Sequence, residues 1–135
     1  MKYLNKKMVI VLNRLAIELT EGIAATTTNL RVGQNLGFVD QIYYNSSYGM
    51  PLYPDIFHQA AAYMFYIIKN HTFHDGNKRT GLAAAITFLS LNDIQFAPFD
   101  EATVYDFVIA VASGPNDSEL AIPNIAAWLK AMSLY

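Results

Sequence analysis

The chain has 135 residues, of which 53% are hydrophobic and 15% charged, with a net charge of −2 and no cysteine. This length suits a single domain over residues 1–135 with a real core, and the charged share lies below the usual value of about 25%. The near-neutral charge offers no basic face for direct binding of nucleic acid, and the lack of cysteine excludes disulfide frameworks and thiolate metal sites.

No segment has the pattern of a membrane or secreted protein. The longest apolar run, residues 60–68, is far shorter than the ~20 residues that a membrane helix needs. The basic N-terminus is not followed by the apolar segment and small-residue cleavage site of a signal peptide. We therefore expect a cytoplasmic protein with no membrane partner.

The first half of the chain reads as helices separated by one long loop. Apolar residues recur at helical spacing in a first segment that closes at Glu21 and Gly22: Met8, Leu12, Leu15 and Leu19. A second amphipathic run covers residues 30–44, and Ser, Gly and Pro residues then predict a loop over residues 45–54 that could hold a short hairpin. Asp55 is a good N-cap for a helix that runs to about Lys69.

The second half predicts three more helices. Residues 77–92 are apolar nearly all round, which is typical of a buried central helix. Asp100 caps the next helix, which Gly114 and Pro115 end, and Pro123 suits the first position of a last helix over residues 123–135. The best strand candidate, residues 94–96, is short. The predicted fold is therefore all-α, a compact helical bundle.

Residues 71–81, His-Thr-Phe-His-Asp-Gly-Asn-Lys-Arg-Thr-Gly, hold more polar chemistry than a turn between helices requires. Gly76 and Asn77 stand at a helix N-terminus, where unpaired N–H groups and the helix dipole favour an anion. Gly76 also lets the backbone approach a ligand closely. Lys78 and Arg79 place two cations at the end of the helix that the dipole disfavours, so they are expected to bind an anion such as phosphate.

Two further residues complete a site for group transfer. Asp75 offers a hard oxygen ligand suited to Mg²⁺, which binds through one or two carboxylates plus substrate phosphates. His71, four residues earlier, is the natural candidate for a base that acts on a hydroxyl nucleophile. A base, a metal ligand and a phosphate cradle together predict phosphoryl or nucleotidyl transfer.

Simpler interpretations exist for several of these residues. Asp75 or Asn77 could merely cap the helix, and Phe73 is expected to be a core anchor of the loop. His74 should face solvent, and His58 should be a hydrogen-bonded packing residue. A structural metal site or a metal hydrolase ranks third, because such sites usually need three or more protein ligands.

The pattern His71-x-Phe73-x-Asp75-Gly76-Asn77-Lys78-Arg79 resembles the signature of the Fic/Doc superfamily in its Doc (death-on-curing) form. The resemblance is strong over the central third of the chain and looser in the flanking helices. It implies a small helical bundle with a buried central helix that follows the motif loop, in agreement with the pattern of helices above.

This chain departs from the AMP-transferring Fic pattern at two positions. Lys78 stands where those proteins have a second glycine, and Leu82 stands where they have a final arginine that grips the γ-phosphate. Doc-type proteins share the lysine, and the resemblance implies that they bind the nucleotide in the reversed sense and transfer the γ-phosphate of ATP. Their known target is a threonine of elongation factor Tu, and they are toxins silenced by a partner antitoxin.

The resemblance also implies a role for each motif residue. His71 is the base, Asp75 holds Mg²⁺, and the phosphates lie on Gly76, Asn77, Lys78 and Arg79, with Lys78 and Arg79 neutralising the charge that develops during transfer. The implied enzyme is a protein kinase-like phosphotransferase. Transfer of AMP to a protein hydroxyl is the close rival, and a catalytically silent binding protein with the Fic fold is the alternative of another class.

The end of the first predicted helix partly resembles the inhibitory Ser/Thr-x-x-x-Glu-Gly helix of some Fic proteins. Ile17 stands where the Ser or Thr should be, and the motif arginine that the glutamate would pair with is Leu82. Glu21 and Gly22 are therefore interpreted as an ordinary helix end, and any inhibition is expected to come from another chain.

Overall fold

The computed structural model describes residues 1–21, 30–31, 33–47 and 53–134. These residues form α1 (Lys6–Glu21), α2 (Gly37–Ser47), α3 (Ile56–Lys69), α4 (Asn77–Leu91), α5 (Glu101–Ser113) and α6 (Ser118–Met132). Their only extended pairings, within the described ranges, are two isolated bridges, Leu30 with Phe73 and Phe96 with Ser133. The all-α prediction is confirmed. None of the described helices has the length and hydropathy of a membrane-spanning segment.

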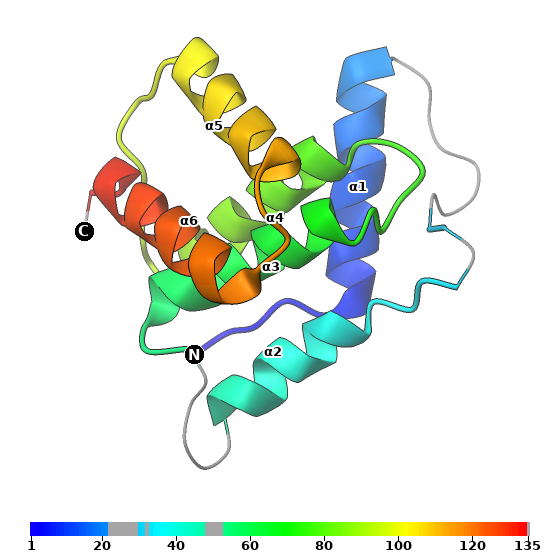
Figure 1. The fold of residues 1–135 in the computed structure, drawn as a ribbon, viewed down its shortest axis with the longest axis horizontal. Coiled ribbons are helices and arrows are strands. Elements are labelled where there is room, and N and C mark those ends of the chain that lie inside the picture. The colour runs from blue at the N-terminus through cyan, green and yellow to red at the C-terminus, as the bar shows by residue number, and fades with distance from the viewer. Residues whose placement is uncertain (22–29, 32, 48–52, 135) are drawn as a thin grey trace.

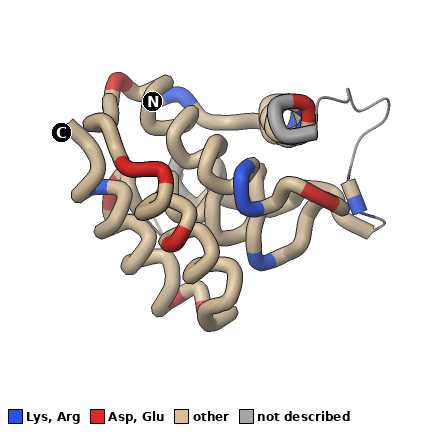
Figure 2. The backbone as a smooth tube through the Cα atoms, turned by 90° about the horizontal axis from the view of Figure 1, so that it is seen from above, with Lys and Arg blue, Asp and Glu red and all other residues tan. Residues whose placement is uncertain are grey.

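The helices are arranged around α3 (Figure 1). α3 and α4 run side by side in opposite directions, and the loop that joins them lies against α1. α6 packs along α3 on the side away from α1, α2 packs on the same helix from below, and α5 leans on α3 and α4. Basic and acidic residues are interspersed along the described backbone (Figure 2).

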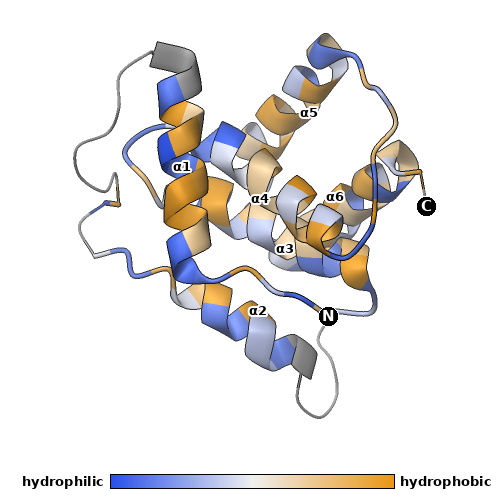
Figure 3. Cartoon of the chain, turned by 180° about the vertical axis from the view of Figure 1, so that it is seen from behind, coloured by the Kyte–Doolittle hydropathy of each residue, from blue (hydrophilic) through white to orange (hydrophobic). Residues whose placement is uncertain are grey.

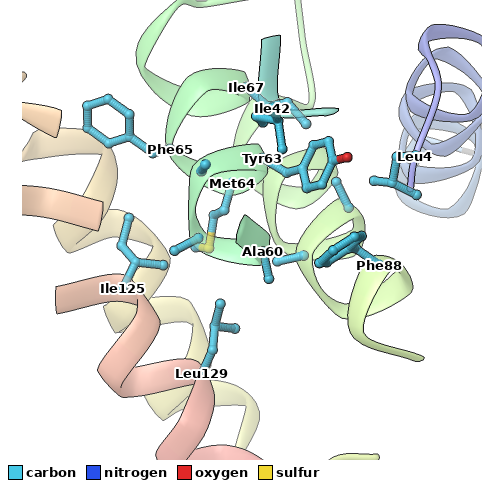
Figure 4. Packing of buried hydrophobic residues seen from close by; sticks show 14 of the residues in the cluster. Leu4, Ile42, Ala60, Tyr63, Met64, Phe65, Ile67, Phe88, Ile125 and Leu129 are labelled. Carbon is cyan, nitrogen blue, oxygen red and sulfur yellow. The ribbon is translucent and has the colours of Figure 1, made fainter. Parts of the chain in front are cut away.

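The core is built mainly from α3 (Figure 4). Side chains of this helix meet the helices on all its sides: Ala60, Tyr63, Met64, Phe65 and Ile67 from α3, with Ile42 of α2, Phe88 of α4, and Ile125 and Leu129 of α6. The helix after the motif, predicted to be the buried central one, lies between α1 and α3 but buries only part of its surface. The helix before the motif is more completely buried, because α4 also borders a cavity on its far side.

Gly81 lets α3 and α4 approach closely. A Cβ at this position would lie 2.8 Å from Ile68 Cγ1 and 3.1 Å from the carbonyl oxygen of Met64. Real Cβ atoms essentially never approach another heavy atom to 2.8 Å. Gly81, two residues after the motif, therefore sets the spacing between the two central helices.

Local capping signals predicted most helix ends correctly. Asp55 caps α3 by accepting hydrogen bonds from the backbone N–H and the Nδ1 of His58, each to Asp55 Oδ1, at 2.9 and 2.8 Å. Burial raises the pKa of Asp55, but the bonds from His58 outweigh this effect and lower it overall. Asp100 is the N-cap residue of α5 and Gly114 ends the helix, as predicted, but the Asp100 side chain makes no capping hydrogen bond to the backbone and instead accepts one from Thr103 Oγ1 at 3.0 Å. Lys69 Nζ donates to the carbonyls of Ala112 and Gly114 at 3.0 and 2.6 Å, which ties the end of α3 to the end of α5.

The predicted start of the last helix was wrong. α6 begins at Ser118, one residue after Asp117, whose side chain accepts a hydrogen bond from the N–H of Glu119. Pro123 lies inside the helix and not at its first position. A proline at this depth lacks the N–H that would bond the carbonyl four residues earlier, but the helix continues to Met132 and packs on α3. Packing outweighs the local preference.

Three other boundaries also differ from the prediction. The amphipathic run over residues 30–44 is helical only from Gly37, and α2 continues to Ser47, into the predicted loop. Residues 48–52 of that loop, with its proposed hairpin, lie outside the described residues. The strand candidate at 94–96 forms a single bridge, supported by hydrogen bonds from Ala97 N–H to the Met132 carbonyl and from Leu134 N–H to the Gln95 carbonyl.

The last two helices are joined by an aromatic stack. The rings of Phe107 on α5 and Trp128 on α6 lie 4.0 Å apart between centroids and are nearly parallel, at 6°. Stacked aromatic pairs contribute about 0.5–1.5 kcal/mol beyond the area they bury. This pair therefore connects α5 to the helix that packs on the core.

Candidate functional site

The loop between α3 and α4 begins with a strained residue. Asn70 ends α3, and His71 follows with φ of +47°, in the left-handed region where glycine is the usual occupant of this position. The N–H of His71 donates to the carbonyl of Ile68 at 3.3 Å. Non-glycine residues in such conformations cluster at functional sites. A histidine held here therefore supports a role for its side chain beyond that of a turn residue.

Phe73 fixes the middle of the loop. Its side chain is 1% exposed and belongs to the hydrophobic core, as the core-anchor interpretation predicted. The preceding residue, Thr72, is also buried, and its carbonyl accepts a hydrogen bond from the N–H of Arg31 at 3.1 Å. His71 and His74, on either side of this buried pair, are exposed. The loop thus presents two histidines to solvent from a rigid base.

The side chain of Asn77 holds the backbone of Phe73 from the other end of the loop. Its Oδ1 accepts from the N–H of Phe73, and its Nδ2 donates to the Phe73 carbonyl, both at 2.8 Å. Both polar atoms of the carboxamide are therefore used inside the loop. The structure gives Asn77 a role in loop shape that the sequence analysis did not include, and its contact with phosphate stays a prediction.

The N-terminus of α4 carries no side-chain cap. Its N-cap residue is Gly76, with φ of +76°, and within the described residues no side-chain hydrogen bond caps the helix. Asp75 Oδ1 accepts instead from the N–H of Gly76, at 2.8 Å. The interpretation of Asp75 or Asn77 as a simple helix cap is therefore wrong, and the first turn keeps N–H groups that can bind an anion.

A cavity of about 610 Å³ opens at this helix end. One wall is the motif: Asp75, Gly76, Asn77, Lys78 and Arg79, with Leu82 one turn later. The opposite wall comes from α5 and the segment before it: Phe99, Glu101, Val104, Tyr105 and Val108. Lys78, Arg79 and Tyr105 are exposed, and hydrophobic residues follow one another along α5 (Figure 3). The cavity therefore has a polar, cationic side and a largely apolar side.

The structure brings together five of the six predicted site residues. Those that line the cavity are Asp75, Gly76, Asn77, Lys78 and Arg79. His71 is not among the lining residues and lies exposed at the start of the loop. A target hydroxyl that reaches His71 would thus approach from solvent.

The metal-site alternative gains no support. Within the described residues, no three His, Asp or Glu side chains lie close enough to hold a metal ion on their own. His58, the only further imidazole, is half-buried and bonds Asp55 on α3, as predicted for a packing residue.

The sequence analysis missed two parts of the site. Asn13 of α1 is fully buried, and its Nδ2 donates to the Asp75 carbonyl and to Thr80 Oγ1. Its spacing from the buried Val9 and Ile17 is the helical i, i+4 pattern, so a polar residue on an apolar stripe was the available signal. The α5 wall had no such signal, because only the fold places it opposite the motif.

Comparison with known proteins gives one family. A model of the Fic/DOC family matches residues 3–89, from before α1 to the end of α4. The chain is 38% identical over 85 residues to a protein named Toxin Doc from Mycolicibacterium smegmatis, covering 62% of this chain and 65% of that protein. It is 32% identical over 78 residues to Protein kinase doc of Escherichia phage P1, covering 58% of this chain and 57% of that protein. The chain thus matches less than two thirds of either relative.

Proposed function

The chain belongs to the Fic/DOC family, and from this membership we propose that it is a Doc-type toxin that transfers the γ-phosphate of ATP to a Ser or Thr hydroxyl of a target protein. Relatives named Toxin Doc and Protein kinase doc support the choice of the Doc type and of a kinase-like activity. The target we propose is elongation factor Tu, with inhibition of translation as the result.

The observation that carries the proposal is the pair Lys78 and Leu82, which both line the cavity. Lys78 puts a long cationic side chain where AMP-transferring relatives have glycine. Leu82 offers no hydrogen-bond donor for a γ-phosphate held in their orientation. Because charge-assisted contacts to phosphate are among the strongest hydrogen bonds, this orientation is strongly disfavoured. The reversed orientation places the γ-phosphate near Lys78, Arg79 and the uncapped end of α4.

Asp75 fits a magnesium ion that accompanies ATP. Its carboxylate is exposed, lines the cavity and lies beside the proposed phosphate site. Mg²⁺ in proteins commonly uses one or two carboxylates plus substrate phosphates, so a single aspartate is sufficient. When bound, the ion would neutralise phosphate charge, which complements the work of Lys78 and Arg79.

The transfer itself needs one base. The target hydroxyl oxygen forms a bond to the γ-phosphorus while the bond from that phosphorus to the bridging oxygen of ADP breaks. The hydroxyl proton passes to an unprotonated imidazole nitrogen of His71, and ADP leaves. Lys78, Arg79 and the N–H groups of the first turn of α4 stabilise the charge on the transferring group.

ATP labelled at different phosphates distinguishes the reactions. Incubation of the protein with Mg²⁺ and a bacterial lysate, or with purified elongation factor Tu, is expected to label protein from γ-labelled ATP and not from α-labelled ATP. Label from the α-phosphate would mean AMP transfer and would overturn the orientation argument. Absence of label from both positions would favour a silent binding protein.

We also propose that a partner antitoxin silences the protein in the cytoplasm. Wild-type protein expressed alone is therefore expected to arrest growth of a bacterial host, and the His71→Ala variant is not. Co-expression of a small protein encoded beside it should restore growth, most plainly if that protein supplies a helix with an apolar face. Normal growth with active wild-type protein would contradict the toxin proposal.

A further inference from the structure

Asn13 is a buried carboxamide on an otherwise apolar stripe of α1. Val9, Asn13 and Ile17 follow one another at one-turn intervals, with exposed fractions of 0%, 0% and 8%. Burying a polar group without hydrogen bonds is unfavourable, so such a residue is retained only where its bonds have a use. Asn13 uses only one of its two polar atoms. Its Oδ1 has no hydrogen-bond partner among the described residues.

Both hydrogen bonds of Asn13 go to the ends of the anion-binding turn. Its Nδ2 donates to the carbonyl of Asp75 at 2.9 Å, just before Gly76, and to Thr80 Oγ1 at 3.1 Å, in the first turn of α4. The two acceptors thus enclose residues 76–79, which carry the first N–H groups of the helix and the two cations. The N–H of Thr80 in turn donates to the carbonyl of Gly76 at 2.8 Å.

α1 also lies directly against Gly76. A Cβ on this glycine would lie 3.2 Å from Asn13 Nδ2 and 3.5 Å from Ile17 Cγ1. α1 therefore contacts one face of the left-handed turn at Gly76. Within the loop, the side chain of Asn77 hydrogen-bonds the backbone of Phe73. α1 thus contacts the turn that carries Asp75 and the first N–H groups of α4.

We propose that Asn13 is a positioning residue for the phosphate site, which acts through the Asp75 carbonyl and Thr80 and not by touching the nucleotide. This inference rests on the proposed function, because it assigns the turn to phosphate and Mg²⁺. The unpaired Oδ1 of Asn13 supports this role. An apolar residue at position 13 would leave no buried acceptor unpaired, but it would lack the Nδ2 donor that bonds both Asp75 and Thr80. Asn13 thus makes α1, far from the motif in sequence, part of the site.

The variant Asn13→Leu tests this role because it keeps a γ-branched shape and removes both the donor and the unpaired acceptor. Val9→Ala is the matched control: it disturbs the same buried stripe of α1 one turn earlier and removes no hydrogen bond. Thr80→Val removes only one of the two bonds of Asn13. Each is compared with the unchanged protein in thermal melting, in binding of ATP with Mg²⁺ by calorimetry on a His71→Ala background, and in steady-state transfer.

Asn13→Leu is expected to weaken binding of ATP with Mg²⁺ by roughly tenfold and to raise KM by the same factor. Its kcat should fall as well, because the same turn carries groups that stabilise the charge on the transferring group. Thr80→Val should have a smaller effect of the same kind, and Val9→Ala should lower the melting temperature while leaving nucleotide affinity unchanged. Unchanged affinity in Asn13→Leu, or an equal loss in Val9→Ala, would overturn the positioning role.

Amide hydrogen exchange separates this inference from the proposed function, because it needs no nucleotide. Within this turn the N–H groups of Gly76 and Thr80 are hydrogen-bonded, to Asp75 Oδ1 and to the Gly76 carbonyl. Asn13→Leu should accelerate exchange at these two residues relative to the rest of α4, whereas Val9→Ala should not. If the unchanged protein fails to bind ATP but this pattern is seen, the proposed function fails and the positioning of the turn stands. If exchange at Gly76 and Thr80 is unaffected in Asn13→Leu, the positioning fails whatever the ligand.

Discussion

His71→Ala is expected to lower the rate of phosphoryl transfer by roughly 10²–10⁴-fold, the usual contribution of a general base. The variant should retain binding of ATP with Mg²⁺, because His71 does not line the cavity that holds the phosphate-binding residues. Initial rates with γ-labelled ATP and a calorimetric titration with ATP and Mg²⁺ measure the two quantities. Transfer at a rate near that of the unchanged protein would remove His71 from the mechanism.

The neighbouring histidine provides the control. His74 is exposed on the same loop, so His74→Ala should leave transfer nearly unchanged.

A third variant, His71→Gly, tests the backbone strain at residue 71. It should be as inactive as His71→Ala but more stable than that variant by about 1 kcal/mol, since alanine still occupies the left-handed conformation at a cost that glycine avoids. Equal stability of the two variants would show that the backbone at residue 71 relaxes elsewhere.

Asn77→Ala is expected to lower the free energy of unfolding by roughly 2–4 kcal/mol, because it leaves both the N–H and the carbonyl of the part-buried Phe73 backbone without partners. The melting temperature should fall by on the order of 10 °C. Binding of ATP with Mg²⁺ should weaken as well, because the same carboxamide fixes the loop that carries Asp75. Thermal denaturation and calorimetry measure the two effects.

The far end of the same helix offers a matched control. Asn92 also makes several hydrogen bonds with one carboxamide, to the carbonyls of Lys2 and Phe88 and from the N–H of Lys2. Asn92→Ala should therefore cost stability without changing nucleotide affinity. If both variants weaken binding in proportion to their loss of stability, Asn77 has no specific role in the site.

Local signals predicted the fold well where a short sequence decides the structure. The caps at Asp55 and Gly114 depend on residues within one turn, and both were correct. The prediction from Pro123 was wrong for the same reason, because proline locally prefers the start of a helix. Asp117 caps α6 about one and a half turns earlier. Packing of α6 on α3 then stabilises a helix that has the proline in its interior. Whether α3 or α4 is more buried depends on which helices surround each of them. The spacing of apolar residues along the chain carries no information about these neighbours.

The candidate site likewise has a part that was predicted from local sequence and a part that was not. The motif wall of the cavity is nearly contiguous in sequence, so residue spacing was sufficient to predict that these residues lie together. That they bind an anion stays a prediction. Asn13 is separated from its two partners by 62 and 67 residues, and the α5 wall meets the motif only across the cavity. Such long-range contacts are specified by the packing of whole helices, so residue spacing along the chain could not predict them.

The stack of Trp128 on Phe107 gives the protein a built-in optical reporter. Trp128 is the only tryptophan in the chain, so all tryptophan emission comes from one known place, the junction of α5 and α6. α5 carries much of the apolar wall of the cavity, and the residue stacked on the indole belongs to it. Any ligand that draws α5 toward the motif or pushes it away would alter this stack and with it the emission. A ligand that moves α5 would thus be detected by tryptophan emission in the unlabelled, unmodified chain.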